Sequence, residues 1–153
     1  MGSFFNWVIG ERVAKYKGRL AVSKNSLEGL KVTTISIAGV AKTMTVSALL
    51  GGMLIYDPTG GVVALTTPTA AQIVAALGPA AVKGTVFKFY LRHAGETTGE
   101  GMTLTAGDGV TLSPATQIVN GDEILSTLVR LDNVTADSEA VTIYSLGLDL
   151  MTT

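Results

Sequence analysis

The sequence contains no cysteine and only one histidine among its 153 residues. The absence of cysteine excludes a disulfide-stapled scaffold, a thiol nucleophile and a zinc–cysteine centre. A single histidine cannot form a cluster of imidazole metal ligands or a relay between two histidines. The composition therefore excludes several common classes of catalytic and metal-binding site.

Charge is also scarce, because 15% of the residues are Asp, Glu, Lys or Arg whereas 47% are hydrophobic. Globular domains usually carry about 25% charged residues. Intrinsic disorder is excluded, since disordered chains are poor in apolar residues and rich in charge. The length suits one domain. We expect a small β-rich body that buries part of its apolar surface in contacts between subunits.

The few charges are distributed unevenly along the chain. Residues 1–31 carry six basic and two acidic side chains, a net charge of +4, and the other 122 residues carry a net charge of −5. This asymmetry predicts a basic N-terminal arm at 1–31 and a single domain at 32–153. A solvated arm without a partner is the alternative. The arm residues that we expect to bind a partner are Phe4, Phe5, Trp7, Arg12, Lys15, Lys17 and Arg19.

Two features could suggest a membrane protein, and neither has the right pattern. The apolar start of the chain precedes the basic residues, which is the reverse of a secretory signal. The run 37–56 is long enough to span a bilayer, but Lys42 and the pair Gly51 and Gly52 interrupt it. The alternation at 43–46 favours strands. We therefore predict a buried hairpin with strands at 42–46 and 53–56, and no membrane partner.

From residue 32 onward, short alternating runs are separated by Gly, Pro and Asn turn signals. In the run 85–92, Phe87, Phe89 and Leu91 share one side, which we assign to the core. About eight to ten such strands predict a mainly β fold, an antiparallel β-sandwich of the jelly-roll-like kind. The other predicted strands are 32–37, 62–66, a hairpin within 101–113 around Gly107, 117–119, 123–131 and 140–144.

One short helix is predicted at about 68–77. Thr67 is placed to cap its N-terminus, and Pro68 to occupy its first position. Gly78 and Pro79 end the apolar periodicity. This is the one helix that the pattern indicates.

The candidate catalytic groups carry no recognisable motif. His93 has no nucleophile or orienting carboxylate that the spacing selects, so we interpret it as a loop histidine at the surface or a subunit contact. The acidic residues do not alternate as calcium ligands do, and we interpret them as solvated turns. They are Asp108, Asp122, Glu123, Asp132, Asp137 and Glu139. We expect no catalytic residue, no cofactor and no metal.

Nucleic-acid binding is not favoured either. The glycine-rich run 95–101 is acidic and lacks the Lys-Ser/Thr of a phosphate-binding loop. Tyr90 with Lys88 and Arg92 is the one aromatic and basic trio on a predicted strand of the body. Acidic residues outnumber basic ones around it.

Several segments together resemble small β-sandwich proteins and domains on viral and bacteriophage particles. They are the helix region 65–77 with its Thr-Pro start, the strand start at 84–89, the run 103–112, the triplet 133–135 and the strand 139–144. The resemblance covers about residues 62–146. It implies a capsid decoration (cement) protein or related head-surface protein, a homotrimer bound to the major capsid protein on the virion surface, without catalysis. The alternative is a receptor- or carbohydrate-binding module of a phage fibre or spike, and an enzyme is the third hypothesis.

Overall fold

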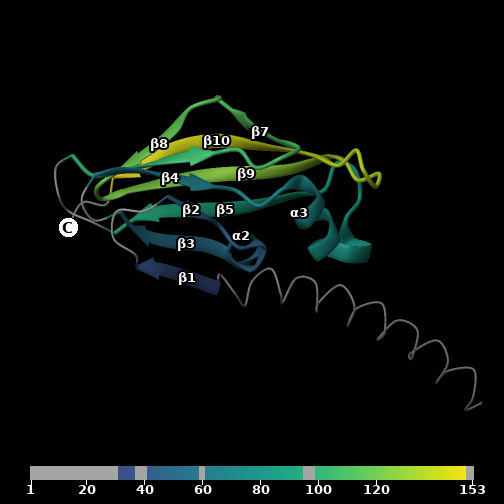
Figure 1. Cartoon of the computed structure of the whole chain (residues 1–153), viewed down its shortest axis with the longest axis horizontal. Coiled ribbons are helices and arrows are strands. Elements are labelled where there is room, and N and C mark those ends of the chain that lie inside the picture. The colour runs from purple at the N-terminus through teal and green to yellow at the C-terminus, as the bar shows by residue number, and fades with distance from the viewer. Residues whose placement is uncertain (1–30, 37–40, 59–60, 95–98, 151–153) are drawn as a thin grey trace, which may run out of the picture. The chain divides into compact units, whose positions relative to one another are not determined.

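Figure 1 shows a computed structural model of the chain, which describes residues 31–36, 41–58, 61–94 and 99–150. For 31–36 it describes the backbone alone. The helices are α2 (Val46–Gly51), α3 (Ala70–Leu77) and the short 3-10 helix η1 (Gly78–Ala80). The strands are β1 (Lys31–Ser36), β2 (Lys42–Thr43), β3 (Gly52–Asp57), β4 (Val62–Thr66), β5 (Val86–His93), β6 (Gly101–Thr105), β7 (Val110–Ser113), β8 (Gln117–Asn120), β9 (Glu123–Asn133) and β10 (Ala140–Leu150).

The strands form two sheets, so the fold is mainly β, as the alternating runs predict. Sheet A has the order β1-β3-β5-β9-β10-β7, and sheet B has the order β2-β4-β6-β8. The chain crosses between them repeatedly, since β3, β5 and β7 belong to sheet A whereas β4, β6 and β8 belong to sheet B. Each sheet is therefore built largely from strands that are not consecutive in the sequence.

This crossing makes the sheets mixed, and the prediction of antiparallel sheets is wrong. β1–β3, β3–β5, β2–β4, β4–β6 and β7–β10 are parallel pairs, whereas β5–β9, β9–β10 and β6–β8 are antiparallel. When a chain visits the other sheet between two strands, the second strand can return in the same direction as the first. Side-chain alternation reports which face of a strand is buried, and it carries no information about the direction of the neighbour.

The core lies between the inner faces of the two sheets. Phe89 and Leu91 are buried and Phe87 is partly buried against them, which confirms the core face predicted for this strand. Each large aliphatic or aromatic side chain that is fully buried stabilises the fold by about 1.5–3 kcal/mol relative to leaving it exposed. Other large side chains that are fully buried include Leu54, Leu65, Met102, Leu104, Leu125 and Leu131.

The predicted helix is present as α3, but its cap differs from the prediction. The Thr69 hydroxyl oxygen accepts a hydrogen bond from the Gln72 N–H at 3.2 Å, and the Gln72 side-chain oxygen accepts one from the Thr69 N–H at 3.0 Å. This reciprocal capping box satisfies two backbone donors at the helix start. Thr67 is instead buried, and its hydroxyl accepts from the Gly107 N–H at 2.9 Å. Thr67 and Pro68 therefore precede the helix.

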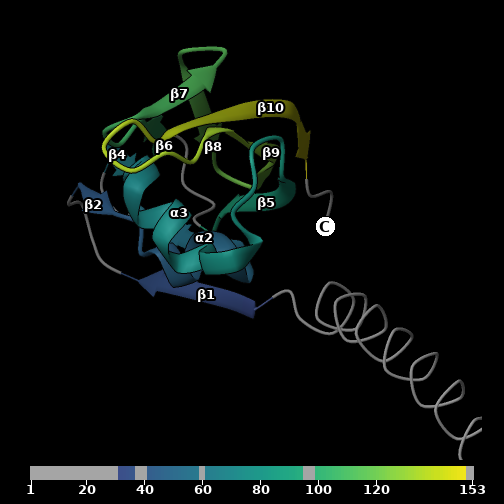
Figure 2. The ribbon, with the colours of Figure 1, turned by 90° about the vertical axis from the view of Figure 1, so that its right-hand side faces the viewer.

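The hairpin predicted from strands at 42–46 and 53–56 is wrong, because β2 belongs to sheet B and β3 to sheet A. The first strand is present only as β2 at Lys42–Thr43, and a second helix, α2, begins at Val46. The Thr45 hydroxyl caps it by accepting from the Ala48 N–H at 3.2 Å, and Gly52 ends it with a φ of 93°. Glycine adopts this left-handed conformation without a Cβ clash. Ala48 and Leu49 are buried, and α2 lies beside α3 (Figure 2). Four alternating residues were too short a pattern to separate a strand from a capped helical turn.

The hairpin predicted within 101–113 is also wrong, because its two strands belong to different sheets. β6 pairs in sheet B and β7 in sheet A, so the residues between them cross from one sheet to the other. Gly107 makes this crossing possible. A Cβ at this position would lie 2.5 Å from the Thr67 carbonyl oxygen and 2.7 Å from that of Pro68. The two backbones approach more closely than any larger residue allows.

Candidate functional site

The outer side of sheet B carries no charged residue at its described positions. The strand register places on one face the side chains of residues that pair across β2, β4, β6 and β8. Val62 is 66% exposed and Ile118 is 43% exposed on this side. We name it the uncharged face, and it consists of Thr43, Val62, Ala64, Thr66, Gly101, Thr103, Thr105, Ile118 and Asn120.

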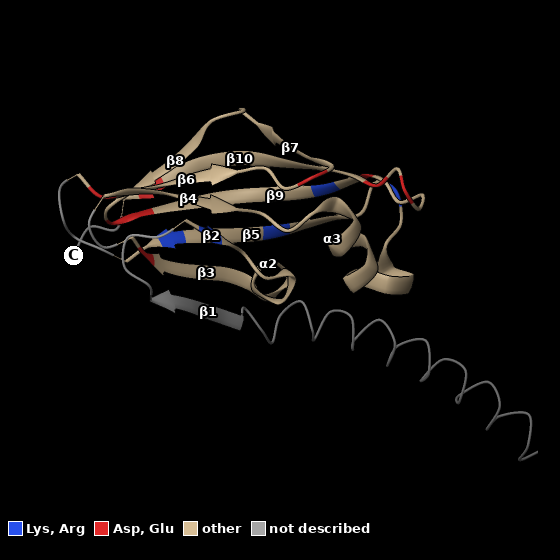
Figure 3. Cartoon of the chain, in the orientation of Figure 1, with Lys and Arg blue, Asp and Glu red and all other residues tan. Residues whose placement is uncertain are grey.

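The outer side of sheet A has the opposite character. Lys88, Arg92 and Arg130 lie on it, and they are three of the five lysine and arginine side chains that the structure describes. Figure 3 shows them as blue segments of β5 and β9. Tyr90 and Tyr144 share this side. We name these five residues the basic face.

One contact network orders part of the basic face. The Arg130 Nε donates to an Asp132 carboxylate oxygen at 2.6 Å, and its guanidinium carbon lies 5.1 Å from the centre of the Tyr144 ring. The other oxygen of Asp132 accepts from the Thr142 hydroxyl. The hydrogen bond to Asp132 raises the pKa of Arg130. Arg130 is therefore held over the Tyr144 ring, with its positive charge at the surface.

The sequence trio of Tyr90, Lys88 and Arg92 does share this face, as its spacing along one strand requires. Lys88 is exposed, whereas Tyr90 and Arg92 are each half-buried. Tyr144 joins them from β10, and no short-range sequence signal links it to β5. The aromatic and basic residues are thus gathered by the pairing of β5 with β9 and of β9 with β10.

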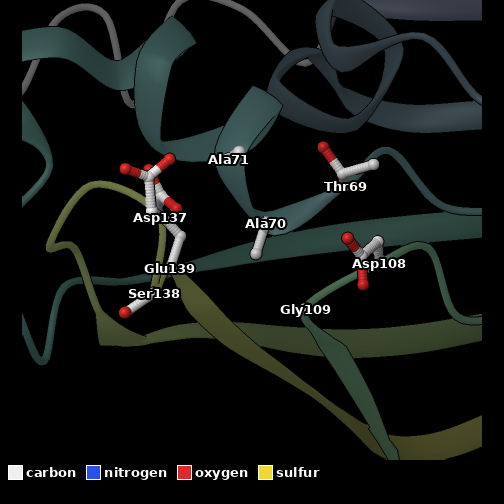
Figure 4. A pocket seen from close by; sticks show the side chains of 8 residues that line it. All are labelled: Thr69, Ala70, Ala71, Asp108, Gly109, Asp137, Ser138 and Glu139. Carbon is white, nitrogen blue, oxygen red and sulfur yellow. The ribbon is translucent and has the colours of Figure 1, made fainter.

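A hollow of about 430 Å³ opens at the start of α3. Figure 4 shows the carboxylates of Asp108, Asp137 and Glu139 around it, with Thr69 at its edge. The Ala70 N–H donates to the Asp108 carbonyl oxygen at 2.8 Å, which ties this loop to the first turn of α3. Acidic side chains near a helix N-terminus are stabilised by its dipole. The described part of the chain contains no group of three acidic or histidine side chains arranged to hold a metal ion.

Asp122 lies in the turn between β8 and β9, and Glu123 is the first residue of β9. The Asn120 N–H and side-chain amide both donate to a Glu123 carboxylate oxygen, at 2.7 Å and 3.2 Å. Asp122 adopts a positive φ of 60°, as does Asp137 in its own loop with 62°. These hydrogen bonds and backbone angles are typical of turns, as the sequence indicates for the turn at Asn120.

The prediction of a loop histidine at residue 93 is wrong. His93 is the last residue of β5 and is fully buried, opposite Tyr56 of β3. It continues the alternation of Phe89 and Leu91, and the strand extends one residue further than the pattern at 85–92 indicates. Burial raises the pKa of Tyr56, and the nearby Asp57 raises it further. Two titratable side chains thus lie in the core at one end of the parallel β3–β5 pair.

Sequence reasoning missed the second half of β10. The sequence pattern predicts a last strand at 140–144, but the strand continues to Leu150 with Leu146, Leu148 and Leu150 all exposed. The alternating leucines of 146–150 were the signal that could have found it. The arm residues expected to bind a partner lie outside the described part of the chain, namely Phe4, Phe5, Trp7, Arg12, Lys15, Lys17 and Arg19.

Comparisons with protein-family models, with curated proteins and with solved structures found no match to this chain. Among the helices of the described residues, none has the length and apolar character needed to cross a membrane. The surfaces of the two sheets and the edge of sheet A are therefore the features on which a functional hypothesis rests.

Proposed function

We propose that the chain is a structural virion protein of the decoration, or cement, type. In this role it binds the major capsid protein on the outside of a capsid and stabilises the shell as a homotrimer, without catalysis. Its body would be a variant of a jelly-roll-like sandwich, in which the chain crosses repeatedly between two sheets. The proposal rests on the sequence resemblance at 62–146 and on the character of the surface.

The uncharged face is the observation that supports this role most directly. A soluble protein usually covers the solvent side of a sheet with charged and polar side chains, because they remain hydrated. Here the described positions of that side carry only small, hydroxyl, amide and apolar side chains, with Val62 and Ile118 prominent among them. Depletion of charge is the compositional mark of the centre of a protein interface. The uncharged face suits a flat protein surface as its partner.

The mode of action that follows is mechanical. Each subunit contributes a modest contact area, and several subunits held together bind a repeating surface by avidity. The basic arm at 1–31 would add a second attachment to an acidic part of the shell. A decoration protein working in this way needs no nucleophile, metal or cofactor.

Cosedimentation with capsids tests the proposal. The chain would be mixed with capsids assembled from the major capsid protein of the same genome, and the bound stoichiometry measured. We expect saturable binding that weakens at least 10-fold in Val62→Lys and Ile118→Lys, since each puts a charge in the centre of the contact. The matched control is Val82→Lys, because Val82 is 60% exposed and lies outside the uncharged face. Absence of saturable binding, or equal binding by all variants, would refute the proposal.

The basic face favours one second candidate, a receptor- or carbohydrate-binding module of a fibre or spike. Tyr90 and Tyr144 lie two strands apart on the same side of sheet A, with the Arg130 guanidinium over the Tyr144 ring. Aromatic rings beside fixed hydrogen-bond donors suit the apolar and hydroxyl parts of a sugar. Glycan-array binding that is lost in Tyr90→Ala and kept in Val62→Lys would favour this candidate over the first.

A further inference from the structure

The edge of sheet A that ends with β7 has a step in it. β10 has eleven residues, but β7 pairs with only four of them, Val141–Tyr144 in the register. Residues 145–150 pair with β9 on one side, and no described strand lies on their other side. β7 therefore lies beside the first half of β10 (Figure 1), and the edge of β10 at 145–150 has no described strand beside it. We name this unpaired edge the recess.

The recess is apolar, and no described strand covers it. Leu146, Leu148 and Leu150 are 54%, 47% and 73% exposed. Leu148 faces the core side of the sheet, since it pairs with the buried Leu125 of β9. Edge strands of soluble proteins are normally protected by lysine, proline or a covering segment. Residues 145–150 contain neither residue type, and their one charge is Asp149.

We propose that a second copy of this chain occupies the recess. In the resulting pair, β7 of each copy lies against residues 145–150 of the other, around a two-fold axis perpendicular to sheet A. β7 runs parallel to its own β10, so it would run antiparallel to the β10 of the second copy. A projection of four residues and a recess of six, on the same edge, are complementary to themselves under this rotation. The contact is isologous, the commonest kind in homo-oligomers.

The charges permit this pairing. β7 is Val110–Ser113 and contains no charged residue, so Asp149 of one copy meets the uncharged β7 of the other. Like charges directly opposite each other, which destabilise strand pairs, are avoided. Val110 and Leu112 already pack in the core of their own copy, and Thr111 points outward.

The small area that the edges supply limits the strength of the pair. About ten residues of edge at ~3.3 Å each, on a sheet about 10 Å thick, give roughly 330 Å² per copy. Stable complexes bury about 1,200–2,000 Å² in total, and weak ones bury less. We therefore expect a concentration-dependent dimer with a dissociation constant in the micromolar range or weaker, favoured where copies are crowded.

This inference does not depend on the proposed function, because association through the edge requires no capsid. It also differs from the trimer that the resemblance implies, since two-fold pairing gives a dimer. Failure of capsid binding would leave the pairing intact, and variants that lose the pairing would still bind capsids through the uncharged face. The two proposals can therefore fail separately.

Sedimentation velocity of the full chain over a concentration series tests the pairing. We expect the average mass to rise with concentration as copies, or trimers of copies, pair around the two-fold axis. Leu146→Lys and Leu148→Lys should each weaken this association about 100-fold, because every substitution occurs twice in a two-fold interface. These side chains are exposed, so the variants should fold, and Val82→Lys is the matched control. A monomer at every concentration, or an oligomer of any size that the lysine variants leave unchanged, would overturn the inference.

Disulfide trapping provides a second test that reports geometry. The chain has no cysteine, so Thr111→Cys and Asp149→Cys can each be made as single-cysteine proteins. Both side chains lie on the outer side of sheet A, since Thr111 pairs with Thr142 and Asp149 pairs with Ile124. An oxidised mixture of the two should give a cross-linked heterodimer, since a disulfide needs α-carbons about 4.4–6.8 Å apart. Thr111→Cys alone should give little. Equal cross-linking in the mixture and in Thr111→Cys alone would contradict the antiparallel arrangement.

Discussion

Replacing Gly107 by alanine adds one methyl group, and it should strongly lower the stability of the fold. The Cβ would lie 2.5 Å and 2.7 Å from the carbonyl oxygens of Thr67 and Pro68, and 2.9 Å from the Pro68 carbonyl carbon. All three are backbone atoms, so no side chain can rotate away. Either the crossing from β6 to β7 or the segment before α3 must move, and the 2.9 Å bond from the Gly107 N–H to the Thr67 hydroxyl would be strained with it.

The expected loss in the free energy of unfolding has two components. Overpacking a well-packed site costs about 1–3 kcal/mol. Loss of the hydrogen bond to the buried Thr67 hydroxyl adds about 1 kcal/mol. We expect the free energy of unfolding to fall by about 3 kcal/mol and the Tm by roughly 10 °C. Such a loss is a large fraction of the total stability of a domain, about 5–15 kcal/mol.

Urea denaturation followed by circular dichroism measures this loss, and Gly101→Ala is the matched control. The Cβ of an alanine at 101 would meet its nearest neighbours at 3.5 Å or more, which is ordinary van der Waals contact. Removing a strand glycine should then be neutral or stabilising by about 0.5 kcal/mol. If the two alanine variants differed by less than about 0.5 kcal/mol, the close approach at Gly107 would not be a determinant of stability.

Three further substitutions test the local chemistry of the fold. Thr69→Ala removes the cap of α3 and should cost about 1 kcal/mol in urea denaturation. Thr127→Val removes the buried hydroxyl that donates to the Phe89 carbonyl at 2.8 Å, and should also cost about 1 kcal/mol. The fold raises the pKa of Tyr56 through burial and Asp57, so the folded state holds the phenol proton more tightly than the unfolded state. Stability should therefore fall as the pH rises above about 10, and the fall should be smaller in Tyr56→Phe, which urea midpoints at several alkaline pH values would show. An equal alkaline decline in both proteins would contradict this assignment, as would an unchanged stability on removal of either threonine hydroxyl.

The local pattern of the chain determined most of its strands and one helix. Phe89 and Leu91 alternate with polar neighbours, and such alternation depends only on the geometry of an extended chain beside a core. The end of α3 at Gly78 is likewise local. Its start was misplaced by two residues because Thr67 and Thr69 offer the same hydroxyl, and only the contact with Gly107 decides which one caps the helix.

The candidate surfaces could be predicted only in part. Lys88, Tyr90 and Arg92 share a side of one strand, which spacing alone shows. Tyr144 joins them from 52 residues further along the chain, through the β9–β10 ladder. The acidic hollow at α3 gathers loops from two distant segments in the same way.

The sequence by itself determined a cysteine-free, mainly β body with little charge and a basic N-terminal segment, because composition and periodicity are local properties. Only the tertiary structure decided that strands cross between two mixed sheets, that His93 is buried and that β10 extends beyond β7. Strand partners are chosen by contacts between residues far apart in the chain. The stepped edge and the uncharged face arise from that choice, and they carry both proposals for how this protein associates.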